Sequence, residues 1–267
     1  MGLSVSARAW RAGIIACGLA WFGPVDLRAE TVEPSAPPPE LIQRSAEPFG
    51  LAASSLTSGG LHDKWLGVQH RLDDEMVQLA LCEGDRDGCV SPAALKFLDI
   101  VDAARSREGR ARLGEINRAI NLAIRPISDL AQHGETDVWT PPLATLARGG
   151  GDCEDYAIAK FIALRRAGIA PDDVRIVVLR DTIHGEDHAV AAARLDGRWL
   201  TLDNRRMAMV EDIDVRNFRP TFVIGEHGVM RYADAPLLAD AAGNTPVAPL
   251  VVSSLAAAAD RPSERAN

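Results

Sequence analysis

The spacing of apolar residues along this chain changes near residue 170. Before that point, apolar positions recur every three or four residues in several segments, which is typical of helices that bury one face. After it, shorter apolar runs are separated by turn-forming residues, which is typical of strands. The pattern therefore predicts an α+β fold in which N-terminal helices pack on an antiparallel sheet.

Four helices are predicted in the first part of the chain. The first covers residues 63–81, and the second begins at Ser91-Pro92, because serine caps a helix well and proline fits its first position. The third ends before Pro126, and the fourth runs over residues 152–167. The N-terminal half of the domain is therefore expected to be mostly helical.

The second part contains five predicted strands, over residues 174–179, 188–194, 198–203, 221–224 and 229–232. Asp196-Gly197 is a favoured two-residue turn and joins the second of these strands to the third. Such a turn fixes how the two strands pair, and it places His188 and Asp203 on one face as diagonal neighbours. An imidazole and a carboxylate are then within reach of a hydrogen bond.

The two ends of the chain differ in composition from this central part. A basic start, a short apolar run and a small residue at position 29 are typical of a secretory signal peptide over residues 1–29. Residues 30–60 are rich in proline, serine, alanine and glycine, which predicts a linker or arm. The predicted domain covers residues 61–234, and residues 235–267 are expected to form a disordered tail.

The four cysteines have separate predicted roles. An exported chain favours a disulfide between Cys82 and Cys89, which bracket a short acidic loop. Cys17 lies in the signal segment, where anchoring as a lipoprotein is the alternative to cleavage. Cys153 has no predicted partner, so it is either a small buried residue or a reactive thiol.

Acidic residues are in excess and crowd the unpaired cysteine. The formal net charge of −8 speaks against nucleic acid as a partner, since nucleic acid requires basic patches. Asp152, Glu154 and Asp155 surround Cys153 after a glycine run, at the predicted start of a helix. The helix terminus lowers the pKa of a thiol, whereas carboxylates raise it. This conflict suggests a bound cation. The alternative is that Asp152 caps the helix and the other two favour its first turn.

Cys153, His188 and Asp203 together form a candidate catalytic triad. A thiol nucleophile needs a base to take its proton, and the base needs a partner that fixes its tautomer. His184 is a competing base, but it lies in a polar stretch outside the predicted strand. Each of these residues taken alone is more often structural, so the inference rests on their combination.

Several of these segments resemble the bacterial transglutaminase-like cysteine proteases, including the LapG-type periplasmic proteases. The resemblance is carried by Asp137-Val138-Trp139-Thr140-Pro141, by Gly149 to Tyr156 with Ala157-Ile158-Ala159-Lys160, by His188-Ala189-Val190 and by Leu202-Asp203-Asn204. It implies a papain-like, transglutaminase-type fold. It also implies that Cys153 is the nucleophile, His188 the base and Asp203 the orienting acid.

The same resemblance implies a periplasmic location and calcium dependence, with the ion at Asp152 and Glu154 and with Asp155 as a further ligand. LapG-type proteases cut large cell-surface adhesins, release biofilm cells and are held by an inner-membrane receptor that responds to cyclic di-GMP. The resemblance implies partners of this kind. The Cys82–Cys89 pair and the proline-rich arm depart from the LapG pattern, which favours a sister branch with another substrate.

Two further functions are compatible with these residues. An amine that captures the acyl-enzyme would make the protein an amide transferase of the transglutaminase type, and water access to the site decides between transfer and hydrolysis. A catalytically silent binding module stabilised by calcium is the third reading, and the intact triad argues against it.

Overall fold

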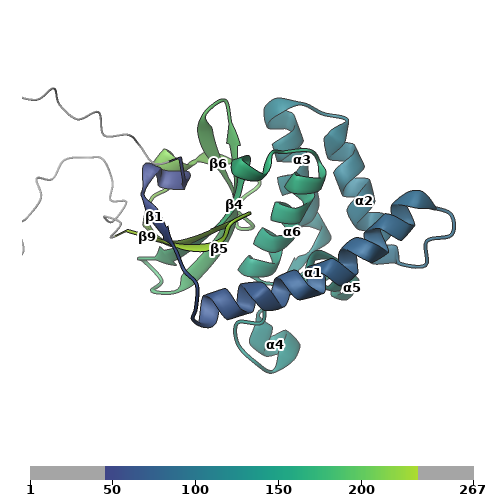
Figure 1. The fold of residues 1–267 in the computed structure, drawn as a ribbon, viewed down its shortest axis with the longest axis horizontal. Coiled ribbons are helices and arrows are strands. Elements are labelled where there is room, and N and C mark those ends of the chain that lie inside the picture. The colour runs from purple at the N-terminus through teal and green to yellow at the C-terminus, as the bar shows by residue number, and fades with distance from the viewer. Residues whose placement is uncertain (1–45, 234–267) are drawn as a thin grey trace, which may run out of the picture. The chain divides into compact units, whose positions relative to one another are not determined.

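The structure is a computed structural model that describes residues 46–233 of the chain. The predicted signal peptide with Cys17, the first part of the linker and the C-terminal tail lie outside the described residues. Helices gather on one side of a sheet, as the predicted α+β class requires (Figure 1). Across residues 46–233, none of the helices has both the length and the apolar character needed to span a bilayer.

The predicted helices form where the apolar spacing places them. The α-helices are α1 (Gly60–Gly84), α2 (Pro92–Arg105), α3 (Gly109–Ala123), α4 (Asp129–His133), α5 (Pro142–Arg148) and α6 (Cys153–Arg166). The Ser91 hydroxyl accepts a hydrogen bond from the Ala94 N–H at 3.2 Å, which confirms the predicted N-cap of α2. The short helices α4 and α5 were not predicted, because neither is long enough to show a helical period.

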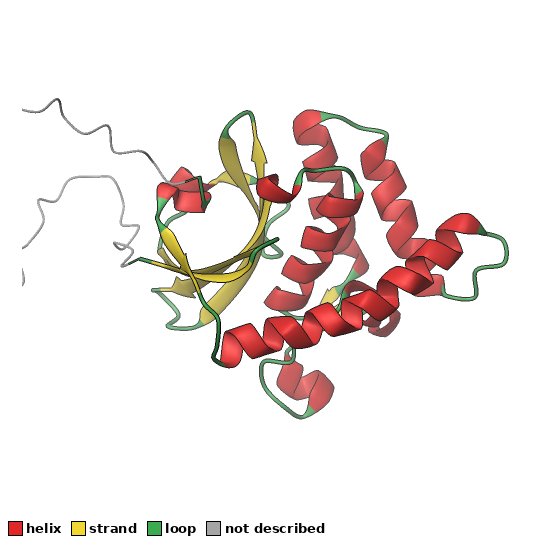
Figure 2. Cartoon of the chain, in the orientation of Figure 1, coloured by secondary structure: helices red, strands yellow, loops and turns green. Residues whose placement is uncertain are grey.

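The strands form one antiparallel sheet of seven in the order β1-β9-β8-β4-β5-β6-β7 (Figure 2). Their bounds are β1 (Ala53–Ser55), β4 (Val174–Asp181), β5 (Asp187–Leu195), β6 (Arg198–Leu202), β7 (Val210–Glu211), β8 (Phe218–Gly225) and β9 (Gly228–Tyr232). Strand β1 pairs with β9 although it lies in the segment predicted as linker. That part of the linker prediction is corrected, because Ala53–Ser55 closes an edge of the sheet.

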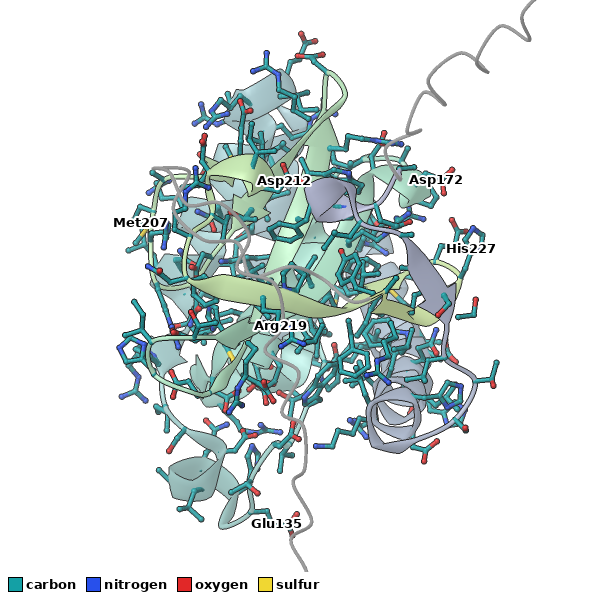
Figure 3. The ribbon with its side chains drawn as sticks, turned by 90° about the vertical axis from the view of Figure 1, so that its left-hand side faces the viewer. Glu135, Asp172, Met207, Asp212, Arg219 and His227 are labelled. Atoms are coloured by element: carbon teal, nitrogen blue, oxygen red, sulfur yellow. A yellow bond between two sulfur atoms is a disulfide. The ribbon has the colours of Figure 1, made fainter. Side chains whose placement is uncertain are left out.

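Short 3₁₀ helices complete the described part, over Pro48–Gly50, Pro171–Asp173 and Asp212–Asp214. A separate parallel pair joins β2 (Arg125–Pro126) to β3 (Gly150–Gly151). Gly150 allows this approach, since a Cβ at this position would lie 2.6 Å from Cδ1 of Ile127, the residue after β2. The pair closes the base of the segment that carries α4 and α5, and Figure 3 shows Glu135 at the outer end of that segment.

The hairpin of β5 and β6 has the predicted register. Leu195 pairs with Arg198, and Ala191 pairs with Leu202. The turn residues Asp196 and Gly197 both have positive φ, 51° and 78°, as a type I′ turn requires. The carboxyl end of β6 therefore lies beside the first half of β5.

Helix α6 packs on β5 and β4 and forms the main core with the other helices. Ala189, Ala191 and Ala193 face this core, and their small side chains let the helix lie close to the strand. Val190 and Ala192 point to the opposite face and pack in a second cluster. Since side chains alternate along a strand, His188 lies on the face of this second cluster, at the end of β5.

The disulfide lies at the far end of α1 from the sheet edge. Cys82, in the last turn of α1, is joined to Cys89, which precedes α2. The bond closes the short acidic loop between these two helices. Within residues 46–233, Cys153 is the free cysteine.

Candidate active site

Cys153 is the first residue of α6, where the glycine run ends. The chain turns at Gly149, which has a φ of 68° and ends α5, and then forms β3 before the helix begins. This places the thiol at the helix N-terminus, half-buried, as predicted. The thiol donates a hydrogen bond to Glu154 Oε2 at 3.0 Å.

His188 and Asp203 are hydrogen-bonded, as the hairpin geometry predicts. His188 Nε2 lies 2.9 Å from Asp203 Oδ1, and both side chains are buried. The same oxygen accepts a hydrogen bond from the Arg205 N–H at 2.9 Å, and Arg206 Nε lies 3.5 Å from Oδ2. His188 Nδ1 is buried without a hydrogen-bond partner. The pair with Asp203 thus puts the ring proton on Nε2 and leaves Nδ1 as an acceptor.

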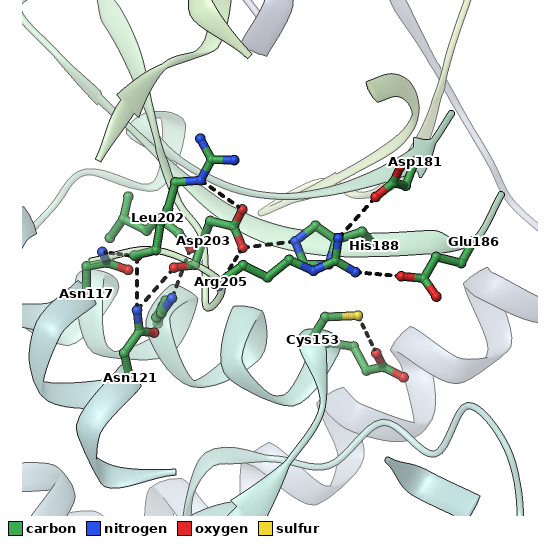
Figure 4. A network of polar contacts seen from close by, with 12 residues as sticks. Asn117, Asn121, Cys153, Asp181, Glu186, His188, Leu202, Asp203 and Arg205 are labelled. Carbon is green, nitrogen blue, oxygen red and sulfur yellow. Dashed lines mark hydrogen bonds and ion pairs between the residues drawn. The ribbon is translucent and has the colours of Figure 1, made fainter. Parts of the chain in front are cut away.

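Cys153 and His188 line one cavity of ≈ 810 Å³. Its wall also includes Trp139, Asp152 and Glu154, so the thiol, the imidazole and two carboxylates face a common space. Figure 4 shows Cys153 together with the His188–Asp203 pair. The cavity is large enough for several residues of an extended peptide.

The carboxylates of Asp129, Asp152 and Glu154 converge beside Cys153, with oxygens that lie within 4.8 Å of one another. Asp129 Oδ1 and Asp152 Oδ1 are buried and make no hydrogen bond. Asp152 occupies the N-cap position of α6, but its side chain makes no capping hydrogen bond. Ca²⁺ prefers oxygen ligands, and carboxylate oxygens that lie close together without hydrogen-bond partners can coordinate it. The residues present therefore fit such an ion.

Asp155 lies outside this acidic group. Its Oδ1 accepts hydrogen bonds from the backbone N–H of Thr140 at 2.9 Å and from the Thr140 hydroxyl at 2.7 Å. Asp155 thereby holds the loop that carries Trp139. The structure groups Asp152 and Glu154 with Asp129 rather than with Asp155, the third ligand predicted from the sequence.

Burial and nearby carboxylates raise the pKa values of Asp152 and Glu154. Burial, followed by the contact with Glu154, raises the pKa of Asp152 to about 8. Burial also raises the pKa of Glu154. Burial and then the charge of Glu154 raise the pKa of the Cys153 thiol, although the Ala189 N–H works against this. The protein's own groups therefore favour a neutral thiol, and the helix terminus does not outweigh the carboxylates.

Asp203 shows the opposite behaviour. Burial pushes the pKa of its carboxyl up, but the hydrogen bond to His188 and the charge of that ring outweigh burial, so the pKa lies below its usual range. Asp203 is thus held as a carboxylate where it can orient the imidazole.

His184, the competing base, is held away from the thiol. Its Nδ1 lies 2.8 Å from Asp181 Oδ2, and its side chain is 63 % exposed. Arg205 joins the same network through Asp181 at 3.1 Å and through Glu186 at 2.7 Å. The network ties the loop between β4 and β5 to the segment that carries Asp203 (Figure 4).

Sequence reasoning missed Asp129 as a member of the site. Asp129 is 24 positions before Cys153 in the sequence and reaches it because β2 pairs with β3. No periodicity or motif marks such a short parallel pair. Lys160, which appeared only within the run that carried the family resemblance, is buried beneath the Asp203 turn.

The helices packed on an antiparallel sheet, with Cys153 and the His188–Asp203 pair on one cavity, form the arrangement expected of a transglutaminase-like cysteine protease. Residues 76–217 match the family model described as bacterial transglutaminase-like cysteine proteinase. That match covers more than half of the chain, and the chain belongs to this family. A comparison with curated proteins gives no match.

Solved structures of similar proteins were also found. Legionella pneumophila LapG is 21 % identical over 60 % of this chain and 88 % of its own, with a TM-score of 0.49. The structure titled "Legionella pneumophila LapG (calcium-bound)" is 20 % identical over 58 % of this chain and 86 % of its own, also with a TM-score of 0.49. A putative cysteine protease from Cytophaga hutchinsonii is 17 % identical over 53 % of both chains, with a TM-score of 0.33.

Proposed function

We propose that this protein is a calcium-dependent cysteine endopeptidase of the periplasm that cuts an exposed segment of a cell-surface or periplasmic protein. The observation that carries the proposal is the His188–Asp203 pair, which leaves His188 Nδ1 without a hydrogen-bond partner in a residue that lines the same cavity as Cys153. A large biofilm adhesin is the proposed substrate, and a cyclic di-GMP-responsive receptor of the inner membrane is the proposed regulator, in line with the sequence resemblance.

The proposed reaction begins when the Cys153 thiol turns from Glu154 towards His188. His188 Nδ1 takes the thiol proton, and the thiolate attacks the scissile carbonyl carbon to form a tetrahedral intermediate. The C–N bond then breaks, and the imidazolium gives its proton to the leaving amine, which leaves a thioester on Cys153. Water, deprotonated by His188, attacks the thioester and releases the acid and the free thiol. Asp203 orients the ring and stabilises its charged form throughout.

Asp129, Asp152 and Glu154 are the proposed ligands of the calcium ion. When bound, calcium supplies positive charge next to the thiol, which opposes the field of these carboxylates. Binding also engages Glu154, the present hydrogen-bond partner of Cys153. Calcium should therefore favour release of the thiol towards His188.

The proposal is tested first with Cys153→Ala and with a matched pair of histidine variants. Cys153→Ala and His188→Ala should abolish cleavage and leave the fold intact, whereas His184→Ala should keep it because His184 lies outside the triad. Surface proteomics of wild-type cells against Cys153→Ala cells should find the substrate as a protein retained in the mutant. Full cleavage by the Cys153→Ala variant contradicts the proposal.

Amide transfer is tested separately. A transferase would incorporate a labelled primary amine into protein substrates at the expense of hydrolysis, and the proposed peptidase should release new N-termini instead. The binding-module reading predicts that a thiol-directed covalent probe fails to label Cys153 with or without calcium.

A further inference from the structure

Lys160 is a fully buried cationic side chain close to the proposed triad. It shows 0 % exposure and lies seven residues after Cys153, two turns along α6 and on the same face of the helix. Its Nζ donates a hydrogen bond to the Leu202 carbonyl at 3.0 Å and lies 5.8 Å from the centre of the Tyr156 ring. Leu202 is the last residue of β6, immediately before Asp203.

Other side chains hold the segment after β6 without carrying charge. Asn117 Nδ2, from α3, donates to the Met207 carbonyl at 2.9 Å, and Asn121 Nδ2 donates to the Asp203 carbonyl at 3.1 Å. These contacts show that neutral amides suffice to anchor the backbone here (Figure 4). Burying an ammonium group costs more free energy than burying a neutral amide. A hydrogen bond to one more carbonyl therefore does not account for the charge of Lys160.

The neighbouring charge that explains the ammonium is Asp203. Burial lowers the pKa of Lys160 to about 7, and the charge of Asp203 works against that shift. The carboxylate is itself buried, and it has to stay ionised to keep the ring proton of His188 on Nε2. Lys160 Nζ is fixed on the carbonyl of the preceding residue, Leu202, so its charge favours the ionised form of Asp203. It does so without contacting the carboxylate oxygens, since Oδ1 binds His188 and the Arg205 N–H, and Oδ2 lies 3.5 Å from Arg206 Nε.

We propose that Lys160 is a positioning residue of the triad, whose buried charge holds Asp203 as an oriented carboxylate so that His188 keeps Nδ1 free for the Cys153 proton. This inference rests on the proposed peptidase function, because it assigns Lys160 a role within that triad. A residue that only anchors the backbone would need the hydrogen bond to Leu202 alone. The proposed role of Lys160 also needs its positive charge.

The test compares Lys160→Met, Lys160→Gln and the control Asn117→Ala in the full-length protein with calcium chloride, at about pH 6, where the amine is protonated. Glutamine keeps a hydrogen-bond donor and removes the charge. The control removes a buried donor to the same segment without touching Leu202 or Asp203. The first readout is the NMR signal of the His188 Nε2-bound proton in protein with labelled histidine. The second is the rate at which iodoacetamide alkylates Cys153, measured by peptide mass spectrometry.

Both Lys160 variants should broaden or lose the His188 Nε2–H signal and slow alkylation of Cys153 by roughly tenfold to a hundredfold, the range expected when a catalytic pair is slightly misplaced. Asn117→Ala should keep the signal and lose less than about twofold in rate. The proposal is overturned if Lys160→Gln keeps the wild-type His188 Nε2–H signal and the wild-type alkylation rate of Cys153. This conclusion holds even if Lys160→Met fails to fold. An equal effect in Asn117→Ala overturns it as well, because simple anchoring then explains the result.

Failure of the peptidase proposal would look different. In that case wild-type Cys153 would react with iodoacetamide no faster than a free cysteine peptide and would cleave no protein. The His188 signal would still report whether the charge of Lys160 governs the His188–Asp203 pair.

Discussion

Cys153 lies between two sets of carboxylates that the protein treats in opposite ways. On one side, Asp203 is hydrogen-bonded to His188 and to a backbone N–H, and the pKa of its carboxyl is lowered. On the other, Asp152 is half-buried, its buried Oδ1 has no hydrogen-bond partner, and its pKa is raised to about 8. The first carboxylate is satisfied by protein groups, whereas the second is suited to a cation from solution. Under the proposed function, the groups that assist the reaction and the groups that bind calcium are thus separated in space around one thiol.

The largest effect is expected when the satisfied carboxylate is neutralised. Asp203→Asn keeps the shape of the side chain but no longer stabilises the charged imidazole, so cleavage should fall on the order of 10³-fold at any calcium concentration. Cleavage rates of a surface-protein substrate with and without excess calcium provide the measurement. If added calcium restored the lost activity, Asp203 would belong to the calcium site and would not be the residue that orients His188.

The matched change on the other side is Asp152→Asn. It should abolish the response to calcium and raise the melting temperature in chelator, because the carboxyl of Asp152 must take up a proton or bury its charge on folding and asparagine needs neither. Asp129→Asn should also weaken the response to calcium, because Asp129 belongs to the same acidic group. Calorimetric calcium titration and thermal unfolding measure both effects.

Asp155→Asn is the control for these two variants. It should lower the melting temperature equally with and without calcium, because Asp155 holds Thr140 and lies outside the acidic group. If Asp155→Asn lost calcium binding and Asp129→Asn kept it, the ligands would be Asp152, Glu154 and Asp155, as predicted from the sequence.

The raised pKa of Asp152 gives stability a definite pH dependence. In chelator, the folded protein holds the proton of Asp152 up to about pH 8, whereas the unfolded chain releases it near the usual value of 3.8. Stability from this group is therefore present at low pH and lost as the pH rises through that window. Melting temperatures in chelator should fall between about pH 5 and pH 8, and calcium should reverse the fall. A flat profile in chelator would contradict the assigned burial.

The smallest effect on the site is expected from the disulfide. Replacing both Cys82 and Cys89 with serine should cost about 2 kcal/mol of unfolding free energy, given the short loop they close. The bond joins α1 to the start of α2, away from the cavity, so cleavage and calcium binding should stay unchanged below the melting temperature. Denaturant unfolding combined with the cleavage assay separates the two quantities.

Local patterns predicted the longer helices α1, α2, α3 and α6, the hairpin of β5 and β6, and the contact between His188 and Asp203. The Asp196-Gly197 turn was sufficient for this contact because a two-residue turn fixes the pairing of every residue in the hairpin. Asp152 and Glu154 were found because they are adjacent to Cys153 in the sequence.

The parts that could not be predicted depend on pairing between distant segments. β1 and β2 are three and two residues long, and their partners are far away in the chain. Main-chain hydrogen bonds leave no mark on side-chain periodicity, so neither pair has a sequence signal. Asp129 was missed for this reason. The role of Asp155 was missed because its partner, Thr140, belongs to a loop whose path the sequence does not specify.

The parallel pair of β2 and β3 also determines where this protein tolerates added sequence. Because the pair ties Pro126 to Gly151 at the base of the segment, changes in length at its outer end do not reach the thiol. Gly134, Glu135 and Thr136 are exposed there (Figure 3). An affinity tag or fluorophore placed between Glu135 and Thr136 should leave Asp129 in register, whereas one extra residue before Asp129 should displace it. The loop after α4 is therefore an attachment point from which substrate engagement can be followed.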